Sequence, residues 1–206
     1  MAFDNFPPYE HVEATLTLPT PAFSLAQRLR VETAEAHAKL EATVGFDIHR
    51  PSVAIATGML QSFYRVLTTL EPAMMALLPL RLRERQRLPL LRADLAVLGL
   101  STEARSVAQD RMALPQNEAE ALGALYVMEG STLGGKLITK SLKQCTNWPL
   151  RGITYFNPYG ERTGSMWAEF QLELSAVSYS CADDVVRGAN QTFAILESAL
   201  ALEAVC

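Results

Sequence analysis

Apolar residues recur every three or four positions along most of the chain after residue 22, which predicts a series of amphipathic helices. The first is expected to begin at Ser24, because Ser24 and Gln27 fit a capping box, and to end at Gly45. Further helices are predicted over residues 52–78, 90–98, 103–112, 118–145, 163–180 and 183–202, with Pro72 bending or interrupting the first of these. No stretch alternates with a period of two, so the chain is predicted to be all-α.

The segments outside the predicted helices indicate how the chain is organised into an arm, a loop and one domain. Residues 1–22 have little periodicity and predict an extended arm, because they contain Pro7, Pro8, Pro19 and Pro21. Residues 147–160 are rich in aromatic residues, proline and glycine, which is typical of a loop. A length of 206 residues suits one compact core, so residues 23–206 are expected to form a single domain.

The helix predicted over residues 118–145 is unusual because it contains four glycines: Gly123, Gly130, Gly134 and Gly135. Each glycine costs a helix interior about 1 kcal/mol relative to alanine, so the position of each needs a reason. Gly123, Gly130 and Gly134 share one face, which leaves a strip of bare backbone. One interpretation is a close crossing with another helix. The other is a kinked helix that lies across a flat ligand.

Composition and charge exclude several classes of function. The net charge is −4, which argues against general affinity for nucleic acid or an anionic membrane surface. No apolar run is long enough for a membrane span and the N-terminus does not resemble a signal peptide, so we expect a cytoplasmic protein. The three cysteines follow no metal-binding or disulfide pattern and are expected to stay reduced: Cys145, Cys181 and Cys206.

The most basic segment runs from Arg81 to Arg87 and reads R-L-R-E-R-Q-R. The favoured interpretation is a solvated loop or helix start. The alternative is an electrostatic docking site for an acidic electron-transfer partner.

His37 lies on the first predicted helix and shares a face with Arg30, Thr33, Leu40 and Glu41. A neutral imidazole is a good axial ligand for haem iron, and its second nitrogen needs an acceptor, which Glu41 could supply one turn further on. Arg30 lies about 10 Å before His37 along the axis, a distance that suits a carboxylate at the edge of a large planar ligand. A surface or core histidine with a local partner is the plain alternative.

Four segments resemble the haem oxygenase family, of the bacterial type that produces biliverdin. They are L-R-V-E-T-A-E-A-H-A-K-L-E, A-L-G-A-L-Y-V-M-E-G-S-T-L-G-G, Y-F-N-P-Y-G-E-R-T-G-S-M-W-A-E-F and G-A-N-Q-T-F-A-I-L-E. The resemblance covers about residues 25–202 and implies an all-α, haem-oxygenase-like helical bundle.

The resemblance also implies roles for single residues. His37 would be the proximal ligand of the haem iron, with Glu41 as its hydrogen-bond partner. The distal helix would cover the opposite haem face with the catalytic residues Gly130, Ser131 and Gly134 and the haem-binding residue Gly135. Arg30 and Lys140 would hold the haem propionates, and Tyr126, Trp167 and Phe193 would be pocket walls or plain core. Animal members carry a carboxylate where this chain has Ser131, so a different water network or backbone groups would deliver protons here.

The implied activity is cleavage of haem, as both substrate and cofactor, to biliverdin, carbon monoxide and ferrous iron with O2 and external electrons. Nothing in the sequence resembles a flavin or nicotinamide site, so a ferredoxin, a flavodoxin or a reductase would donate the electrons. A bilin-accepting photoreceptor is a further partner that the resemblance allows. Two alternatives stay open at this point: a non-catalytic haem-binding or sequestering protein on the same fold, and a helical interaction module without haem.

Overall fold

The computed structural model describes residues 24–102, 113–149 and 151–203. The predicted arm over residues 1–22, the predicted helix over residues 103–112 and Cys206 lie outside the described residues. Every regular element in the described ranges is helical, so the all-α prediction is confirmed. The α-helices are α1 (Leu25–Glu32), α2 (Ala34–Val44), α3 (Val53–Leu77), α4 (Pro79–Leu82), α5 (Leu88–Val97), α6 (Glu118–Leu142), α7 (Thr163–Ser175) and α8 (Ala182–Glu203), with short 3-10 helices η2 (Gly160–Arg162) and η3 (Tyr179–Cys181).

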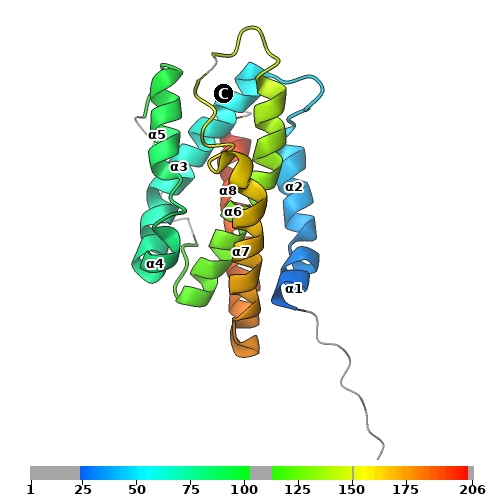
Figure 1. Ribbon diagram of the computed structural model, residues 1–206, viewed down its shortest axis with the longest axis vertical. Helices are drawn as coiled ribbons and strands as arrows, with labels where there is room; N and C mark the ends of the chain where they lie inside the picture. Colours follow the sequence, from blue (N-terminus) through cyan, green and yellow to red (C-terminus); the bar gives the residue numbers. More distant parts are fainter. Residues whose placement is uncertain (1–23, 103–112, 150, 204–206) are drawn as a thin grey trace, which may run out of the picture.

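Helices α6 and α8 pack along each other at the centre of the bundle, and the other helices surround them (Figure 1). Helices α1 and α2 lie at one edge, whereas α3, α4 and α5 lie at the other (Figure 1). The largest fully buried side chains come from both sides of this arrangement and include Leu29, Leu60, Leu67, Leu70, Met74, Leu91, Leu125, Phe170 and Leu174. One continuous core therefore joins the long helices, and Ala36, Leu40 and Val44 of α2 pack against it while staying half-buried.

The predicted helix caps are present. Ser24 and Gln27 form the reciprocal capping box, with the Ser24 N–H donating to Gln27 Oε1 over 2.9 Å. Asn117 accepts the Glu120 N–H over 2.9 Å at the start of α6. Gly45 ends α2 in the left-handed conformation, with φ 59°. These signals could be found from the sequence because each involves residues within one helical turn.

The prediction of one unbroken first helix is wrong, because the helix breaks at Thr33 into α1 and α2. The Leu29 carbonyl accepts both the Thr33 N–H, over 3.0 Å, and the Thr33 hydroxyl, over 2.7 Å. A side chain that bonds to its own backbone in this way competes with regular helix geometry. The break comes four residues before His37 and so sets the direction of the helix that carries it.

The favoured interpretation of the basic segment 81–87 as solvated is also wrong for two of its residues. Arg85 and Arg87 are buried, and both form ion pairs with the buried Glu129 of α6. The alternative of a docking surface fails for the same two residues, because neither reaches solvent. A basic run looks solvated in sequence when its acidic partner is far away along the chain.

Among the described residues, no helix is long and apolar enough to cross a membrane.

Candidate functional site

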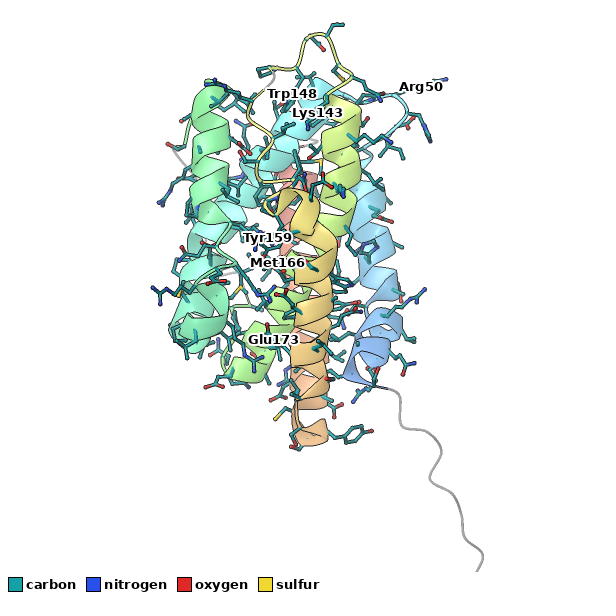
Figure 2. The ribbon with its side chains drawn as sticks, viewed as in Figure 1. Arg50, Lys143, Trp148, Tyr159, Met166 and Glu173 are labelled. Atoms are coloured by element: carbon teal, nitrogen blue, oxygen red, sulfur yellow. The ribbon has the colours of Figure 1, made fainter. Side chains whose placement is uncertain are left out.

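Two contacts set the register between α6 and the α1–α2 pair. At one end the Tyr126 side chain interacts with the Thr33 side chain at the α1–α2 junction. At the other end the Ser141 hydroxyl donates to the Ile48 carbonyl over 2.6 Å. Figure 2 labels Arg50 and Lys143 at this same end of the molecule. Since residue numbers rise from the first contact to the second on both segments, α2 and α6 run in the same direction.

Between these contacts the predicted site residues fall at matching levels. His37 comes one turn after Thr33, and Gly130 comes one turn after Tyr126, so each lies about 6 Å further along its helix. Glu41 and Gly134 follow one turn later on the two helices. We call the surface formed by Arg30, His37, Glu41, Gly130, Gly134 and Leu137 the open strip, because all of these are exposed except Gly130, which is half-buried.

His37 is held loosely in this strip. Its side chain is 55% exposed, and its Nδ1 lies 3.6 Å from Oε2 of Glu41. The edge of its ring meets Phe193 of α8 with 5.7 Å between the ring centroids. All 11 residues of α2 are described, and none of them is buried. Ala36, Leu40 and Val44 are half-buried against the core, so a ligand on the open strip would add contact to the exposed face of α2 that carries His37 and Glu41.

The four glycines of α6 have two kinds of surroundings, so the two interpretations that the sequence left open apply to different glycines. A methyl group on Gly123 would overlap the backbone of Val185 and Ala189, which is the close helix crossing that the sequence left open. A methyl group on Gly135 would overlap the Phe156 carbonyl, so a loop approaches the helix there. Only Gly130 and Gly134 belong to the open strip.

Gly130 and Gly134 leave room beside the helix. A methyl group on Gly134 would meet no heavy atom of the described residues within 4 Å, and one on Gly130 would meet only the edge of Trp167 at 3.8 Å. Helix α6 runs unbroken through both residues. The ligand-facing interpretation therefore suits these two glycines, although the helix is continuous there.

Ser131 lies beside this bare backbone, and its hydroxyl donates to the Met128 carbonyl over 2.8 Å. The side chain is exposed, so its oxygen can still accept a hydrogen bond from water. A serine in this position can order a water molecule, but it brings no negative charge.

The two predicted propionate partners are not brought together. Arg30 precedes the Thr33–Tyr126 contact, whereas Lys140 lies next to Ser141 at the opposite end. At 1.5 Å per residue, this register separates them by about 25 Å along the helix axis. Both propionates of a haem lie on one edge of the ring, so Arg30 and Lys140 would not hold the two propionates of one haem together.

The aromatic residues form a wall on the α7 and α8 sides. The Tyr126 and Trp167 rings lie 5.7 Å apart between centroids, and Phe193 is buried beneath His37. Burial raises the pKa of the Tyr126 phenol, and the Thr33 side chain and Arg30 charge oppose part of that rise. Tyr126 and Trp167 are half-buried, so they border the strip as well as the core.

The residues of the open strip fit a haem. They offer an exposed imidazole with a carboxylate beside it, a backbone strip without side chains, and an exposed apolar group in Leu137. Two hollows of about 270 and 260 Å³ lie elsewhere, beside α2 against α8 and between α1 and α7. Neither is lined by His37 or by the α6 glycines, and the larger one includes Phe193.

Sequence reasoning missed Glu129, which immediately precedes Gly130. Its side chain is 1% exposed, and its two oxygens accept hydrogen bonds from Arg85 and Arg87 over 2.7 Å each. A carboxylate inside the apolar run A-L-Y-V-M-E-G was the available signal, because a charge in a buried helix face requires a partner.

Comparisons with known proteins agree on one family. The family model described as "Heme oxygenase" matches residues 23–201. A protein named "Heme oxygenase" from Xanthomonas campestris pv. campestris (strain 8004) is 36% identical over 125 residues, which cover 58% of this chain and 70% of that protein. The fold is similar to that of heme oxygenase from Leptospira interrogans, with a TM-score of 0.70 at 20% identity, covering 87% of this chain and 100% of that one. It is also similar to heme oxygenase 2 from Chlamydomonas reinhardtii, solved without heme, with a TM-score of 0.61 at 16% identity, covering 86% and 96%.

Proposed function

Because this chain belongs to the haem oxygenase family of haem-degrading oxidoreductases, we propose that it cleaves haem to biliverdin, carbon monoxide and ferrous iron. Dioxygen and external electrons are the co-substrates. The observation that supports the proposal is an exposed imidazole, His37, with Glu41 beside it, together with the side-chain-free backbone of Gly130 and Gly134 on α6, and the register of the two helices is consistent with a similar level for both. Membership of the family rests on the comparisons, whereas the proposed role of each residue rests on this geometry.

His37 is the proposed iron ligand. Its ring is free to turn, since it is more than half exposed and meets a single aromatic ring edge-on. Glu41 lies 3.6 Å from Nδ1, so a small rotation on binding would let Nδ1–H donate to the carboxylate. That hydrogen bond would fix the tautomer with Nε2 free and raise the basicity of the ligand.

Bound haem supplies the iron that activates dioxygen and the ring that is cleaved. The protein supplies position. On the distal side, Gly130 and Gly134 let the backbone of α6 approach the ring closely, so the space for dioxygen is limited on one side. This asymmetry directs the reaction to one edge of the porphyrin.

Protons must reach the distal side without a carboxylate at position 131. The exposed Ser131 hydroxyl, whose hydrogen is donated to the Met128 carbonyl, can accept from a water and hold it beside Gly130. Proton delivery through such a water is the role that we propose for Ser131. The electrons would come from a ferredoxin, a flavodoxin or a reductase.

The proposed function is tested by titrating the chain with hemin and then adding a reductant in air. We expect a Soret band on binding, followed by its loss and the appearance of biliverdin absorbance. A protein that only carries haem would keep the Soret band, and a helical protein without a haem site would never develop one.

The matched control compares two histidines. His37→Ala is expected to abolish normal turnover, whereas His49→Ala should behave like wild type because His49 is exposed on the loop after α2. Wild-type turnover in His37→Ala would refute the ligand assignment, and circular dichroism checks that both variants stay folded.

A further inference from the structure

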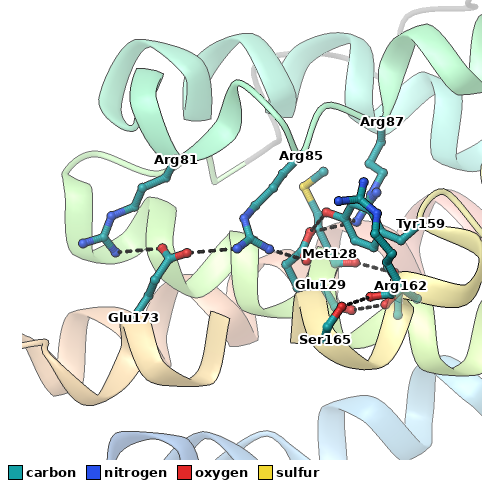
Figure 3. Close-up of polar contacts among 11 residues, drawn as sticks. Arg81, Arg85, Arg87, Met128, Glu129, Tyr159, Arg162, Ser165 and Glu173 are labelled. Atoms are coloured by element: carbon teal, nitrogen blue, oxygen red, sulfur yellow. Dashed lines mark hydrogen bonds and ion pairs between the residues drawn. The ribbon is translucent and has the colours of Figure 1, made fainter. Parts of the chain in front are cut away.

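Five side chains form a row of alternating charges that ends beside α6. We call this row the charge ladder, and its members in order are Arg81, Glu173, Arg85, Glu129 and Arg87. Consecutive members are joined by ion pairs of 3.8, 2.9, 2.7 and 2.7 Å (Figure 3). The ladder links α4, α7, the segment between α4 and α5, and α6. It therefore ties four parts of the fold together.

The ladder runs from the surface into the core. The Arg81 and Glu173 side chains are 40% and 33% exposed, whereas those of Arg85, Glu129 and Arg87 are 6%, 1% and 3% exposed. Burying charges is expensive, and well-packed apolar residues would often be as stable. What a buried ion pair adds in some proteins is a unique register, because its members have few other positions in which all are paired.

The inner end is fully bonded. The Tyr159 hydroxyl donates to Glu129 Oε1 over 2.8 Å, and the Arg87 guanidinium stacks on the Tyr159 ring at 4.5 Å. Burial raises the pKa of Tyr159 to about 12, so the phenol stays a donor at neutral pH. Figure 2 shows Tyr159 and Glu173 at different heights in the molecule, and among the members of the ladder Glu129 is the one on α6.

The position of Glu129 along α6 gives the ladder a consequence for the open strip. Gly123 fixes the first part of α6 against α8, and Gly135 fixes a later part against Phe156. Between them, Gly130 and Gly134 have no side chain with which to hold the helix. Apolar side chains such as Leu125 and Met128 pack this interval into the core, and Glu129 is the charged side chain buried within it, one residue from Gly130.

We propose that Glu129 is a positioning residue for the distal backbone, held by Arg85 and Arg87. It does not touch the substrate. It sets the depth at which Gly130 and Gly134 approach the haem, and so it controls which edge of the porphyrin is attacked. This inference rests on the proposed function, because Glu129 would position the part of α6 that covers the distal face of the haem.

The test compares two buried, ion-paired glutamates on one helix. Glu129→Gln keeps the shape but removes the charge between two arginines. Glu120→Gln is the matched control, because Glu120 is also buried on α6 and pairs with Arg187 over 2.9 Å, but lies beside the α8 crossing. We expect both to lower the midpoint of thermal unfolding.

Two readouts separate positioning from general stability. In the haem-free chain, amide hydrogen exchange across residues 126–137 should become about tenfold faster in Glu129→Gln, whereas in Glu120→Gln the change should be confined to residues 118–124. In the loaded chain, the ratio of biliverdin isomers should change about threefold or more in Glu129→Gln and stay at the wild-type value in Glu120→Gln.

If Glu129→Gln does not fold, Tyr159→Phe removes one hydrogen bond from Glu129 and should itself move the isomer ratio away from the wild-type value. An unchanged isomer ratio in the folded variant, or an equal change in Glu120→Gln, would overturn the inference. A wild-type chain that binds no haem would instead refute the proposed function, and the exchange measurement would still report whether Glu129 anchors α6.

Discussion

At the scale of single residues, Glu71 shows how burial and backbone contacts compete. One of its carboxylate oxygens accepts the N–H groups of Arg87 and Leu88, over 2.7 and 3.0 Å, where α5 begins. Burial raises the pKa of the Glu71 carboxyl above its ordinary value of 4.5, and the two N–H donors and the Arg87 charge offset only part of the rise. Glu71 therefore anchors the start of α5, and its contribution to the free energy of unfolding depends on pH.

The first prediction follows from the sign of this shift. Between pH 4.5 and the raised pKa, the folded chain binds more protons than the unfolded chain, so the contribution of Glu71 to stability falls as pH rises through that window. Glu71→Gln keeps an acceptor oxygen but does not titrate. The free energy of unfolding of wild type relative to this variant should fall from about pH 4.5 upwards, as measured by urea unfolding.

Glu161 provides the control, because its side chain is 98% exposed. Glu161→Gln should leave the pH profile of stability close to that of wild type. A difference between wild type and Glu71→Gln that is constant with pH would contradict the assignment.

The second prediction at this scale concerns Arg30 and Lys140. Because they lie at opposite ends of the open strip, only one of them can hold the propionates of a haem in a given orientation. Arg30→Ala and Lys140→Ala should therefore differ, with one of them changing the ratio of biliverdin isomers and the other leaving it near wild type. Equal changes in both variants would show that haem occupies both orientations or that neither residue holds it.

At the scale of elements, α6 combines opposite uses of glycine. Gly123 needs to be glycine because α8 crosses there, whereas Gly134 has open space beside it. Gly123→Ala should destabilise the fold by about 1–3 kcal/mol through overpacking. Gly134→Ala should stabilise the haem-free chain by up to about 1 kcal/mol through helix propensity. Thermal and urea unfolding of the two variants test this contrast.

A larger side chain at Gly134 of the same helix should affect haem binding without affecting the stability of the haem-free fold. Gly134→Leu should leave the haem-free fold intact but weaken the Soret band on titration with hemin, because the side chain would occupy the open strip. Normal haem binding and turnover in this variant would show that Gly134 does not face the ligand.

At the scale of the whole molecule, α2 is the edge helix that carries the proposed iron ligand. It packs on α8 and α1 without burying a side chain of its own, although contacts at both of its ends tie this edge to α6. Haem bound between His37 and Gly130 should protect amides of residues 34–44 about tenfold or more, with little change in α3, whose face is already in the core. Hydrogen exchange with and without hemin measures this, and protection confined to other helices would place the ligand elsewhere.

Much of the fold could be predicted because its signals are local. The capping box at Ser24, the cap at Asn117 and the left-handed Gly45 each depend on residues within one turn. The break at Thr33 was missed because a threonine inside a helical pattern is usually tolerated. The prediction for the basic segment was wrong because Arg85 meets Glu129 across 44 residues of chain, and periodicity carries no information about that partner.

For the candidate site too, some features could be predicted from the sequence and others could not. The shared face of His37 and Glu41 and the bare backbone at Gly130 and Gly134 were visible in sequence, since helical spacing alone defines them. Their placement at one level was not, and neither was the distance between Arg30 and Lys140. These depend on the register between two helices, which the Thr33–Tyr126 and Ile48–Ser141 contacts set between segments far apart in the chain.

The sequence by itself therefore determined most of the helices, several of their caps and which residue types each face presents, because backbone hydrogen bonds within a helix join residues that are neighbours in the chain. Tertiary structure alone decided which glycines of α6 pack against backbone and which stay open, and which carboxylate neutralises the buried arginines. Those outcomes depend on contacts between segments that are far apart in sequence, where packing and desolvation select one partner among many.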